Sequence, residues 1–487
     1  MPHRSNGVPR TLWSLLLLTL CSQLLIMWAL PYADSSEPRY AAIAQIMVQS
    51  NDWITPWFSP DVPFWGKPPL SFWAQALSFK VFGIHEFTGR LPSWLVNIAI
   101  TALVMHGTRC IMPVPPHATR TESYTPLLAA VIYNTMCLAF SNAGAVLTDP
   151  YLNLGLSLSM VALLQQAAQP STAWGWAFFV GLSIGMLSKG PLALVFCFAP
   201  LVLLAFFRRR FVLNLLGHLP WVSGILLFCA LSLPWYILAE LKTPGFLNYF
   251  LIGEHISRFL VPGWQGDLYG TAHQAPLGSI WLSLLPATFP WGLLSIFLLI
   301  TAWRKQGLRA LKALPSNRLY LLILALFPAI FFTAAGNILW TYLLPGLAPL
   351  AIVTAYYFPP LNRPIQRMVL ALTALVPVAG LVLAGLSLHD VTLTKTDRPI
   401  AQEFLTRAAP SDTLYFVDKP SFSARFYTQE RTASIDPAVF NSNHATAAPA
   451  FVVIANDNTQ MLKTITDLRY TAIAHSKRYQ LFMRSQP

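Results

Sequence analysis

Residues 11–40, TLWSLLLLTLCSQLLIMWALPYADSSEPRY, join an apolar run directly to a charged loop. A helix that crosses a bilayer needs about 20 mainly apolar residues, and the run from residue 11 to residue 30 supplies that length. A cleavable signal peptide is the alternative, but no clear small-residue cleavage site ends the run. We therefore predict an uncleaved first membrane span, followed by a loop outside the membrane.

The composition of the whole chain is that of a membrane protein. Of its 487 residues, 55% are hydrophobic and 10% are charged, whereas soluble proteins carry about 25% charged residues. The net charge of +13 does not indicate a nucleic-acid partner, because the basic residues fall in loops between apolar runs. The five cysteines lie in or beside apolar segments without CxxC spacing, so neither a disulfide framework nor a zinc site is predicted.

The predicted fold class is mainly α and polytopic, with about eleven to thirteen transmembrane helices, depending on how the later apolar runs are divided. Eleven segments are long enough to cross: 11–31, 91–110, 125–142, 150–168, 173–189, 190–207, 219–240, 277–302, 319–336, 337–358 and 366–388.

Basic residues mark alternate loops between these segments. The positive-inside rule places such loops in the cytoplasm, so the N-terminus is predicted inside and, after an odd number of spans, the C-terminus outside. The residues are Arg4, Arg10, Arg109, Arg120, Arg208, Arg209, Arg210, Arg304, Lys305, Arg309, Lys312, Arg318, Arg363 and Arg367.

Beyond His389 the apolar runs shorten to strand length. Strands are predicted at 414–417, 451–455 and 480–483, and helices at 400–407 and 459–468. We predict a transmembrane domain over 1–388, with external loops at 32–90 and 241–276. A small soluble α/β domain over 389–487 is predicted to support that domain or to face the substrate.

The first external loop is predicted to hold two short helices along the membrane surface. Asp34, Ser35 and Ser36 are possible N-caps of the first. Its apolar residues recur at helical spacing and predict one membrane-facing side: Tyr40, Ile43, Ala44 and Met47. The second helix is predicted over 70–82.

Lys67 in this loop is a candidate phosphate ligand. It lies between Trp65 and the pair Pro68-Pro69, a stiff setting at headgroup level where a cation suits a lipid phosphate. A lysine snorkelling to the interface is the alternative. Arg39 either acts with Lys67 or pairs with one of the acids near it, Asp34 or Glu37.

The second external loop contains Glu254, His255 and Arg258. Glu254 and Arg258 are four residues apart and could form a simple helix ion pair. His255 could bind a metal or carry a proton. Because this loop is predicted to face the first one, a functional cluster is the favoured interpretation.

Three further residues lie near predicted membrane boundaries. Asp149 either caps the fourth helix or is a functional acid. Lys189, at the external hinge of two spans, is a second possible phosphate partner. Tyr342, beside Pro345, either belongs to an aromatic belt or donates a hydrogen bond to a donor phosphate.

These motifs resemble the aminoarabinose transferases that modify lipid A, within the wider group related to protein O-mannosyltransferases. The resemblance covers about residues 10–390 and is carried by Ser36–Ala41, Asp52-Trp53, Lys67-Pro68-Pro69, Phe87–Pro92, Thr148-Asp149-Pro150, Lys189-Gly190, Glu254-His255 with Arg258, and Thr341-Tyr342 with Pro345.

The resemblance implies a multispanning enzyme with the GT-C fold in the bacterial inner membrane. Such enzymes pass a sugar from undecaprenyl phosphate to an acceptor at the periplasmic face. It further implies phosphate contacts from Lys67 and Arg258, a role for Asp149 near the donor, and catalysis or metal binding at the acidic start of the first loop.

Two positions depart from the family pattern. The family commonly has adjacent Asp-Glu in the first loop, where this chain has Ser36-Glu37 with Asp34 two residues earlier. The family's acidic metal ligand just before Lys-Pro-Pro is replaced by Gly66. This replacement counts against a metal held by His255 and against assuming lipid A and aminoarabinose as the substrates.

The sequence therefore predicts a glycosyltransferase that uses a polyprenyl-phosphate sugar donor and a glycolipid, glycan or protein acceptor. The candidate catalytic acids are Asp34, Glu37 and Asp149. The candidate donor-phosphate ligands are Arg39, Lys67, Lys189, Arg258 and Tyr342, and a divalent metal, if one is used, is assigned to His255. The alternatives are a polyprenyl-lipid flippase or transporter, a protein O-mannosyltransferase-type enzyme, or an assembly scaffold.

Overall fold

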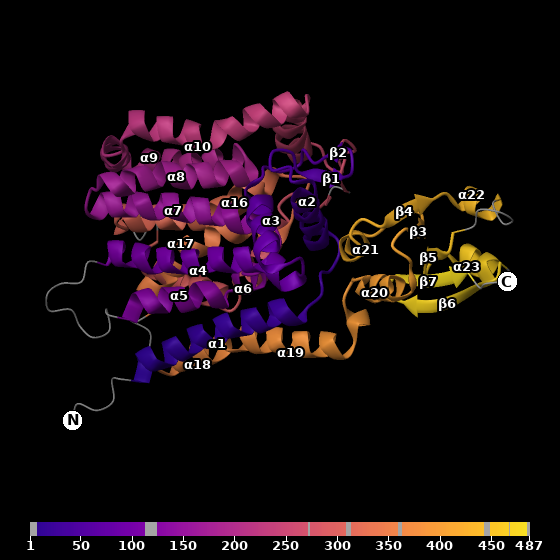
Figure 1. Cartoon of the computed structure of the whole chain (residues 1–487). Helices are drawn as coiled ribbons and strands as arrows, with labels where there is room; N and C mark the ends of the chain where they lie inside the picture. The colour runs from indigo at the N-terminus through magenta and orange to yellow at the C-terminus, as the bar shows by residue number, and fades with distance from the viewer. Residues whose placement is uncertain are drawn as a thin grey trace. The chain divides into compact units, whose positions relative to one another are not determined.

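The computed structural model describes residues 7–112, 124–270, 273–307, 313–358, 363–442, 449–466 and 468–484. Helices dominate the structure (Figure 1). Contacts divide the chain into two units. The membrane unit comprises Met1–Leu25, Phe64–Ser71 and Pro92–Gly380. The loop–sheet unit comprises Ile26–Pro63, Phe72–Leu91 and Leu381–Pro487. These units differ from the predicted domains, because the first external loop groups mostly with the C-terminal residues.

The membrane unit is built from helices that lie side by side in Figure 1. Some continue into the other unit at one end. They are α1 (Gly7–Ala29), α4 (Glu86–Ile111), α5 (Thr125–Thr135), α6 (Cys137–Asn142), α7 (Asp149–Ala168), α8 (Thr172–Lys189), α9 (Leu192–Gly217), α10 (Trp221–Lys242), α11 (Phe246–Asn248), η2 (Tyr249–Ser257), α12 (Arg258–Leu260), α13 (Ile280–Thr288), α14 (Trp291–Gln306), α16 (Ser316–Phe331), η3 (Phe332–Ala334), η4 (Trp340–Gly346), α17 (Leu347–Tyr357), α18 (Arg363–Thr373) and α19 (Leu375–His389).

Six helices in the described residues are long and apolar enough to cross a membrane, and the bent pair α13/α14 makes a seventh when it is counted as one span. All eleven predicted segments contain helix, but several are broken. The predicted segment 125–142 breaks at Met136, where the backbone is extended between α5 and α6. The first part of segment 337–358 is the 3₁₀ turn η4, which contains Pro345, and α17 follows it. Of the basic residues used for orientation, Arg4, Arg120, Arg309 and Lys312 lie outside the described residues.

Glycines bring α7 and α8 into close contact. A Cβ atom on Gly155 of α7 would lie 2.5 Å from the carbonyl oxygen of Gly181 in α8, and one on Gly181 would lie 2.4 Å from Ser159 Oγ. Small residues at such interfaces let membrane helices approach closely. Ser159 Oγ also donates to the carbonyl oxygen of Phe178, at 3.1 Å. Because the two helices run as a hairpin, the first residue of α7, Asp149, is placed beside the last residue of α8, Lys189.

The C-terminal part of the loop–sheet unit is a five-stranded sheet with the order β4-β3-β5-β7-β6. Strands β4, β3 and β5 are parallel, and β7 is antiparallel to β5 and β6. The elements are η5 (Val391–Leu393), α20 (Arg398–Arg407), β3 (Leu414–Val417), α21 (Phe422–Tyr427), β4 (Thr432–Ile435), α22 (Pro437–Ser442), β5 (Phe451–Ala455), α23 (Thr459–Thr466), β6 (Tyr470–His475) and β7 (Tyr479–Arg484).

This sheet confirms the predicted small α/β region and adds two strands. The predicted strands correspond to β3, β5 and β7, while β4 and β6 were missed. Their side chains are mostly half-buried or exposed, so the sequence lacks the apolar run that marks a buried strand. One face of the sheet packs around Phe404, Phe416 and Val453, and the other around Val452 and Phe482.

The first-loop residues of the same unit form α2 (Ser36–Ser50), β1 (Trp57–Ser59), β2 (Val62–Pro63) and most of α3 (Leu70–Phe82). The prediction that α2 has a single apolar side was wrong. Its buried residues include Gln45 and the whole run Tyr40–Met47, and the helix packs on α21 and β1. Ser35, one of the three possible N-caps, occupies the cap position, but its side chain makes no cap hydrogen bond.

Candidate functional site

In the membrane unit, two loops that are distant in sequence bring Lys67 and Arg258 onto one carboxylate. Lys67 Nζ lies 2.6 Å from Glu254 Oε2 and 2.5 Å from the carbonyl oxygen of Gly66. Arg258 Nη1 lies 3.1 and 3.2 Å from the two oxygens of Glu254, and 3.4 Å from Asp267 Oδ2. We call Lys67, Glu254, Arg258 and Asp267 the charge cluster. Two of the predicted phosphate ligands therefore lie together.

Tryptophan and tyrosine side chains hold the two loops of the cluster against each other. The Trp65 backbone N–H donates to the hydroxyl of Tyr269 at 3.0 Å, and Trp65 Nε1 donates to Thr243 Oγ1 at 3.1 Å. Tyr249, from the same loop as Glu254, lies near Trp65, with ring centroids 6.1 Å apart and ring planes tilted by 50°. The aromatic residues of the first loop thus fix the position of Lys67.

Glu254 is the centre of the charge cluster and lies in η2, a stretch of π-helical turns, a conformation that is frequent at functional sites. Its side chain is only 4% exposed. Burial raises the pKa of Glu254, but the positive charges of Lys67 and Arg258 outweigh burial, so that its pKa lies below the usual value. Glu254 is therefore ionised at neutral pH.

A second ion pair lies in the same unit, between Asp149 and Lys189. Lys189 Nζ lies 2.8 Å from Asp149 Oδ1, and both side chains are largely buried. The Lys189 ammonium also sits 4.9 Å from the ring centroid of Tyr342, a cation–π distance. The predicted capping role of Asp149 was wrong: it is the first residue of α7, and the cap position belongs to Thr148, which makes no side-chain cap hydrogen bond.

His255 connects the two groups of charges but does not fit a metal ligand. Its Nδ1 lies 2.7 Å from the carbonyl oxygen of Phe250, and its Nε2 lies 3.0 Å from that of Lys189. Both ring nitrogens therefore have carbonyl neighbours. Position 66, next to Lys67, carries no carboxylate because it is glycine. No group of three or more His, Cys, Asp or Glu residues with metal-binding geometry occurs among the described residues.

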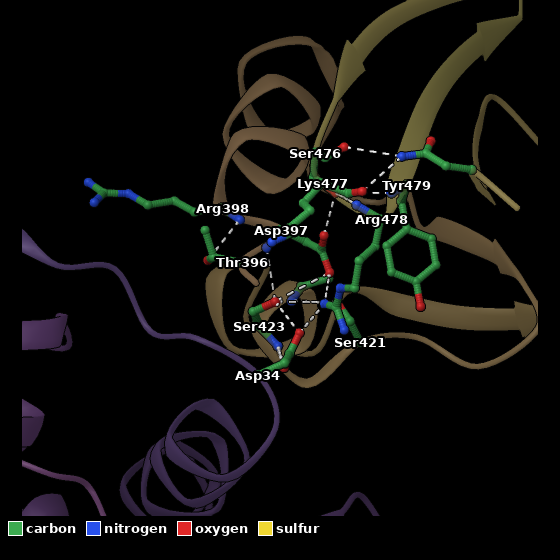
Figure 2. A network of polar contacts seen from close by, with 12 residues as sticks. Asp34, Thr396, Asp397, Arg398, Ser421, Ser423, Ser476, Lys477, Arg478 and Tyr479 are labelled. Carbon is green, nitrogen blue, oxygen red and sulfur yellow. Dashed lines mark hydrogen bonds and ion pairs between the residues drawn. The ribbon is translucent and has the colours of Figure 1, made fainter. Parts of the chain in front are cut away.

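In the loop–sheet unit, Asp34 belongs to a polar network with the C-terminal residues, which Figure 2 shows. Asp34 Oδ1 accepts from the backbone N–H of Ser423 at 2.9 Å, and Oδ2 accepts from Ser423 Oγ at 2.8 Å. Arg478 forms ion pairs with both Asp34 and Asp397. Burial raises the pKa of Asp34, although Arg478 and Ser423 oppose that rise. These contacts give Asp34 a structural function.

Glu37 is paired with Arg90, a residue that sequence reasoning did not select. Arg90 Nη2 lies 2.8 Å from Glu37 Oε2, and Arg90 Nε lies 3.3 Å from Oε1. Arg90 also donates to the backbone carbonyl oxygens of Met27, Leu30 and Pro31. This arginine therefore fixes the orientation of Glu37. The sequence signal that could have identified Arg90 is its position near the start of a predicted span, after an acidic loop.

Arg39 lies in the same unit, with its guanidinium 5.2 Å from the ring centroid of Tyr40 and 5.5 Å from that of Phe422. Its assignment as a phosphate ligand stays a prediction. Other residues that the sequence did not point to are Asp267, Asp397, Ser423 and Arg478.

An apolar pocket lies within the membrane unit, between α7, α9, α16 and the segment from η4 to α17. Its walls include Met160, Phe196, Phe327, Pro345 and Pro349. Pro345 and Tyr342 belong to the same turn, η4. A lining of this kind suits a hydrocarbon chain.

Comparison with known proteins gives both sequence and structural relatives. Residues 11–250 match the family Dolichyl-phosphate-mannose-protein mannosyltransferase. The chain is 32% identical to the undecaprenyl phosphate-alpha-4-amino-4-deoxy-L-arabinose arabinosyl transferase of Erwinia tasmaniensis, over 66% of this chain and 54% of that protein. The Yersinia enterocolitica protein of the same name gives the same identity and coverage. The chain thus matches only about half the length of these curated relatives.

Two solved structures show the fold. The crystal structure of ArnT from Cupriavidus metallidurans bound to undecaprenyl phosphate has a TM-score of 0.78 and 18% identity, and the match covers 98% of each chain. The archaeal oligosaccharyltransferase AglB from Archaeoglobus fulgidus, in complex with an inhibitory peptide and a dolichol-phosphate, has a TM-score of 0.51 and 11% identity, with 91% and 69% covered. The fold of this chain is therefore that of these two structures.

Proposed function

We propose that this chain, a GT-C-fold relative of the aminoarabinose transferases and the protein O-mannosyltransferases, is a membrane glycosyltransferase. It transfers a sugar from a polyprenyl-phosphate donor to an acceptor hydroxyl. The observation that carries the proposal is the convergence of Lys67 and Arg258, from two separate loops, within hydrogen-bonding distance of one carboxylate.

In the proposed reaction, an acceptor oxygen attacks the anomeric carbon of the sugar while the bond from that carbon to the phosphate oxygen breaks. The electron pair of the broken bond stays on the phosphate, and the acceptor proton moves to a carboxylate. Lys67 and Arg258, the phosphate clamp, stabilise the charge that develops on the leaving phosphate. Lys189 and Tyr342 add an ammonium and a hydroxyl nearby, and the apolar pocket takes the first part of the polyprenyl chain.

Asp149 is the carboxylate that the structure favours as the proton acceptor. It lies in the same unit as the phosphate clamp and is paired with Lys189, so movement of Lys189 to the phosphate would free it to act as a base. Glu37 remains the alternative base, oriented by Arg90. Single-turnover transfer by Asp149→Asn and Glu37→Gln separates these assignments, since the true base must show the larger loss.

The test of the function is sugar transfer by the purified protein from undecaprenyl-phosphate sugars. The release of undecaprenyl phosphate is measured with lipid A or an acceptor polypeptide present. Lys67→Ala is expected to lower the rate at least about 100-fold, since it removes a preorganised cation from the leaving group. Lys80→Ala is the matched control, because Lys80 lies in the same loop region and contacts the ring of Trp53 instead. Full activity of Lys67→Ala would exclude the phosphate clamp.

The acceptor and the orientation belong to the same proposal. The resemblance to the aminoarabinose transferases that modify lipid A favours a glycolipid acceptor, whereas the match to the mannosyltransferase family favours a protein hydroxyl. We place the protein in the bacterial inner membrane, with its N-terminus in the cytoplasm and its C-terminal residues in the periplasm. Reporter fusions at the two ends check this orientation, and an active cytoplasmic reporter at the C-terminus would contradict it.

A further inference from the structure

Glu254 occupies the position between Lys67 and Arg258 where a phosphate held by both cations would have to lie. One of its oxygens is 2.6 Å from Lys67 Nζ, and both are within 3.2 Å of Arg258 Nη1. A phosphate that accepts hydrogen bonds from the same two donors must therefore replace Glu254 or push it aside. A buried carboxylate in this position is unexpected for a site that only attracts anions.

The donor and the product carry different charges, and this difference explains why a carboxylate such as Glu254 would be useful between the two cations. The donor phosphodiester carries one negative charge. The product is a phosphomonoester, which carries roughly −1.5 to −2 charges at neutral pH. Coulomb attraction scales with charge, so Lys67 and Arg258 bind the product more strongly than the donor. Two cations alone would retain the product after transfer.

We propose that Glu254 competes with phosphate for Lys67 and Arg258 and thereby promotes release of the polyprenyl phosphate product. The inference rests on the proposed function and assigns product release to a residue of the same site. Glu254 is displaced when the donor binds and returns to the two cations as the product leaves. The Tyr249 hydroxyl, 3.4 Å from Glu254 Oε1, provides it with a further hydrogen-bonding partner.

The surroundings of Glu254 make the competition strong. Its side chain is 4% exposed and those of Lys67 and Arg258 are each 20% exposed, so water and salt screen their interaction only in part. Asp267 stays 3.4 Å from Arg258 and keeps that arginine in place when Glu254 moves. The exchange therefore needs a change in one side chain only.

A purely structural role for Glu254 predicts the opposite behaviour. If Glu254 served only to position Lys67 and Arg258, a neutral isostere would loosen both cations and weaken phosphate binding. If Glu254 is a competitor, the same isostere removes a negative charge from the binding position and strengthens phosphate binding. The substitution Glu254→Gln therefore distinguishes the two roles by the direction of its effect.

The experiment uses the full-length protein in detergent and undecaprenyl phosphate as the probe. Glu254→Gln is expected to lower the Kd for undecaprenyl phosphate about tenfold. Its steady-state rate should fall about tenfold relative to its own single-turnover rate, as expected when product release limits turnover. Glu254→Asp keeps the charge and should remain close to wild type in Kd. Glu240→Gln is the matched control, since the Glu240 carboxylate accepts from the backbone N–H groups of Gly245 and Leu247.

An unchanged or raised Kd for Glu254→Gln would overturn the inference, and a lowered Kd also shows that the variant is folded. A failure of the proposed function would give a different result in the same binding measurement. In that case wild type and Lys67→Ala would bind undecaprenyl phosphate equally, or neither would bind it, whatever Glu254 does.

Discussion

At the scale of single residues, the charge cluster determines how the protein responds to acid. The folded-state pKa of Glu254 is lowered: burial alone would raise it, but Lys67 and Arg258 overcome burial. The unfolded chain therefore binds the proton more readily than the folded protein, and the free energy of unfolding increases with pH in that window. The contribution of Glu254 is complete above about pH 4.5, near the unfolded pKa, and is lost as the pH falls through the lower folded-state value.

Thermal unfolding of the protein in detergent, measured between pH 3 and pH 7, checks this expectation. Wild type should lose stability toward pH 3 more steeply than Glu254→Gln, which has no titrating group at this position. Glu403→Gln serves as the control, because Glu403 forms a surface ion pair with Arg407, and such pairs contribute little. Parallel curves for wild type and Glu254→Gln would show that Glu254 does not titrate as argued.

The sequence indicated the right residue types at this scale but not their partners. Asp149 and Lys189 were selected from their positions near predicted membrane boundaries, and Lys67 and Arg258 from their settings in the two external loops. That Lys67 meets Glu254, 187 residues away, depends on how two loops pack through Trp65, Tyr249 and Tyr269. Local spacing contains no information on such contacts. The pairing of Asp34 with Arg478, across 444 residues, could not be predicted for the same reason.

At the scale of the elements, the α7/α8 hairpin sets the position of the Asp149–Lys189 ion pair. Gly155→Ala would place a Cβ atom 2.5 Å from the carbonyl oxygen of Gly181 and 2.7 Å from the backbone nitrogen of Gly185. Backbone atoms cannot rotate away, so the two helices must separate. Overpacking of this kind costs about 1–3 kcal/mol. We expect a lower Tm and a clear loss of transfer, because Lys189 and Asp149 move apart.

Gly385→Ala is the matched control for this prediction. Gly385 lies in α19, and a Cβ atom there would meet nothing within 4 Å. The measurements are the unfolding temperature in detergent and the single-turnover transfer rate of both variants. If Gly155→Ala matched Gly385→Ala in both, close packing of α7 on α8 would not control the site.

The elements also show where apolar pattern was a sufficient guide and where it was not. The runs of α8 and α10 were predicted almost to their ends, because the length needed to cross a bilayer leaves little choice. Helix α9 continues to Gly217, beyond its predicted end at residue 207. The burial of α2 was not predicted, since its run Tyr40–Met47 reads equally well as a membrane-surface helix. Only its packing on α21, from nearly 400 residues later in the chain, decides between the two.

At the scale of the whole molecule, the first external loop and the C-terminal residues form one folded unit. Besides the contacts of Asp34, the Tyr427 hydroxyl accepts from the backbone N–H of Tyr32 at 2.8 Å and donates to Glu86 at 2.9 Å. The C-terminal residues are therefore part of the fold of the loop that contains Glu37. An independent accessory domain would not supply partners to buried loop residues.

Arg478 is the residue through which this dependence can be tested. One of its nitrogens, Nη2, contacts both Asp34 and Asp397 (Figure 2), whose side chains are 5% and 0% exposed. Arg478→Ala leaves two buried carboxylates near each other without a shared cation. Breaking a buried ion pair by removing one partner costs about 3–5 kcal/mol, so the contact between residues 32–63 and the C-terminal residues should open.

Hydrogen exchange of residues 32–63 and limited proteolysis measure this opening. Arg478→Ala should raise exchange across α2 and β1 and expose the loop to protease, and Arg478→Lys, which keeps the charge, should do so less. Arg407→Ala is the control, because its pair with Glu403 lies at the surface. Protection of residues 32–63 that is the same in Arg478→Ala and wild type would mean that the loop folds without the C-terminal residues. Its carboxylates would then be positioned by Arg90 and the neighbouring loop residues alone.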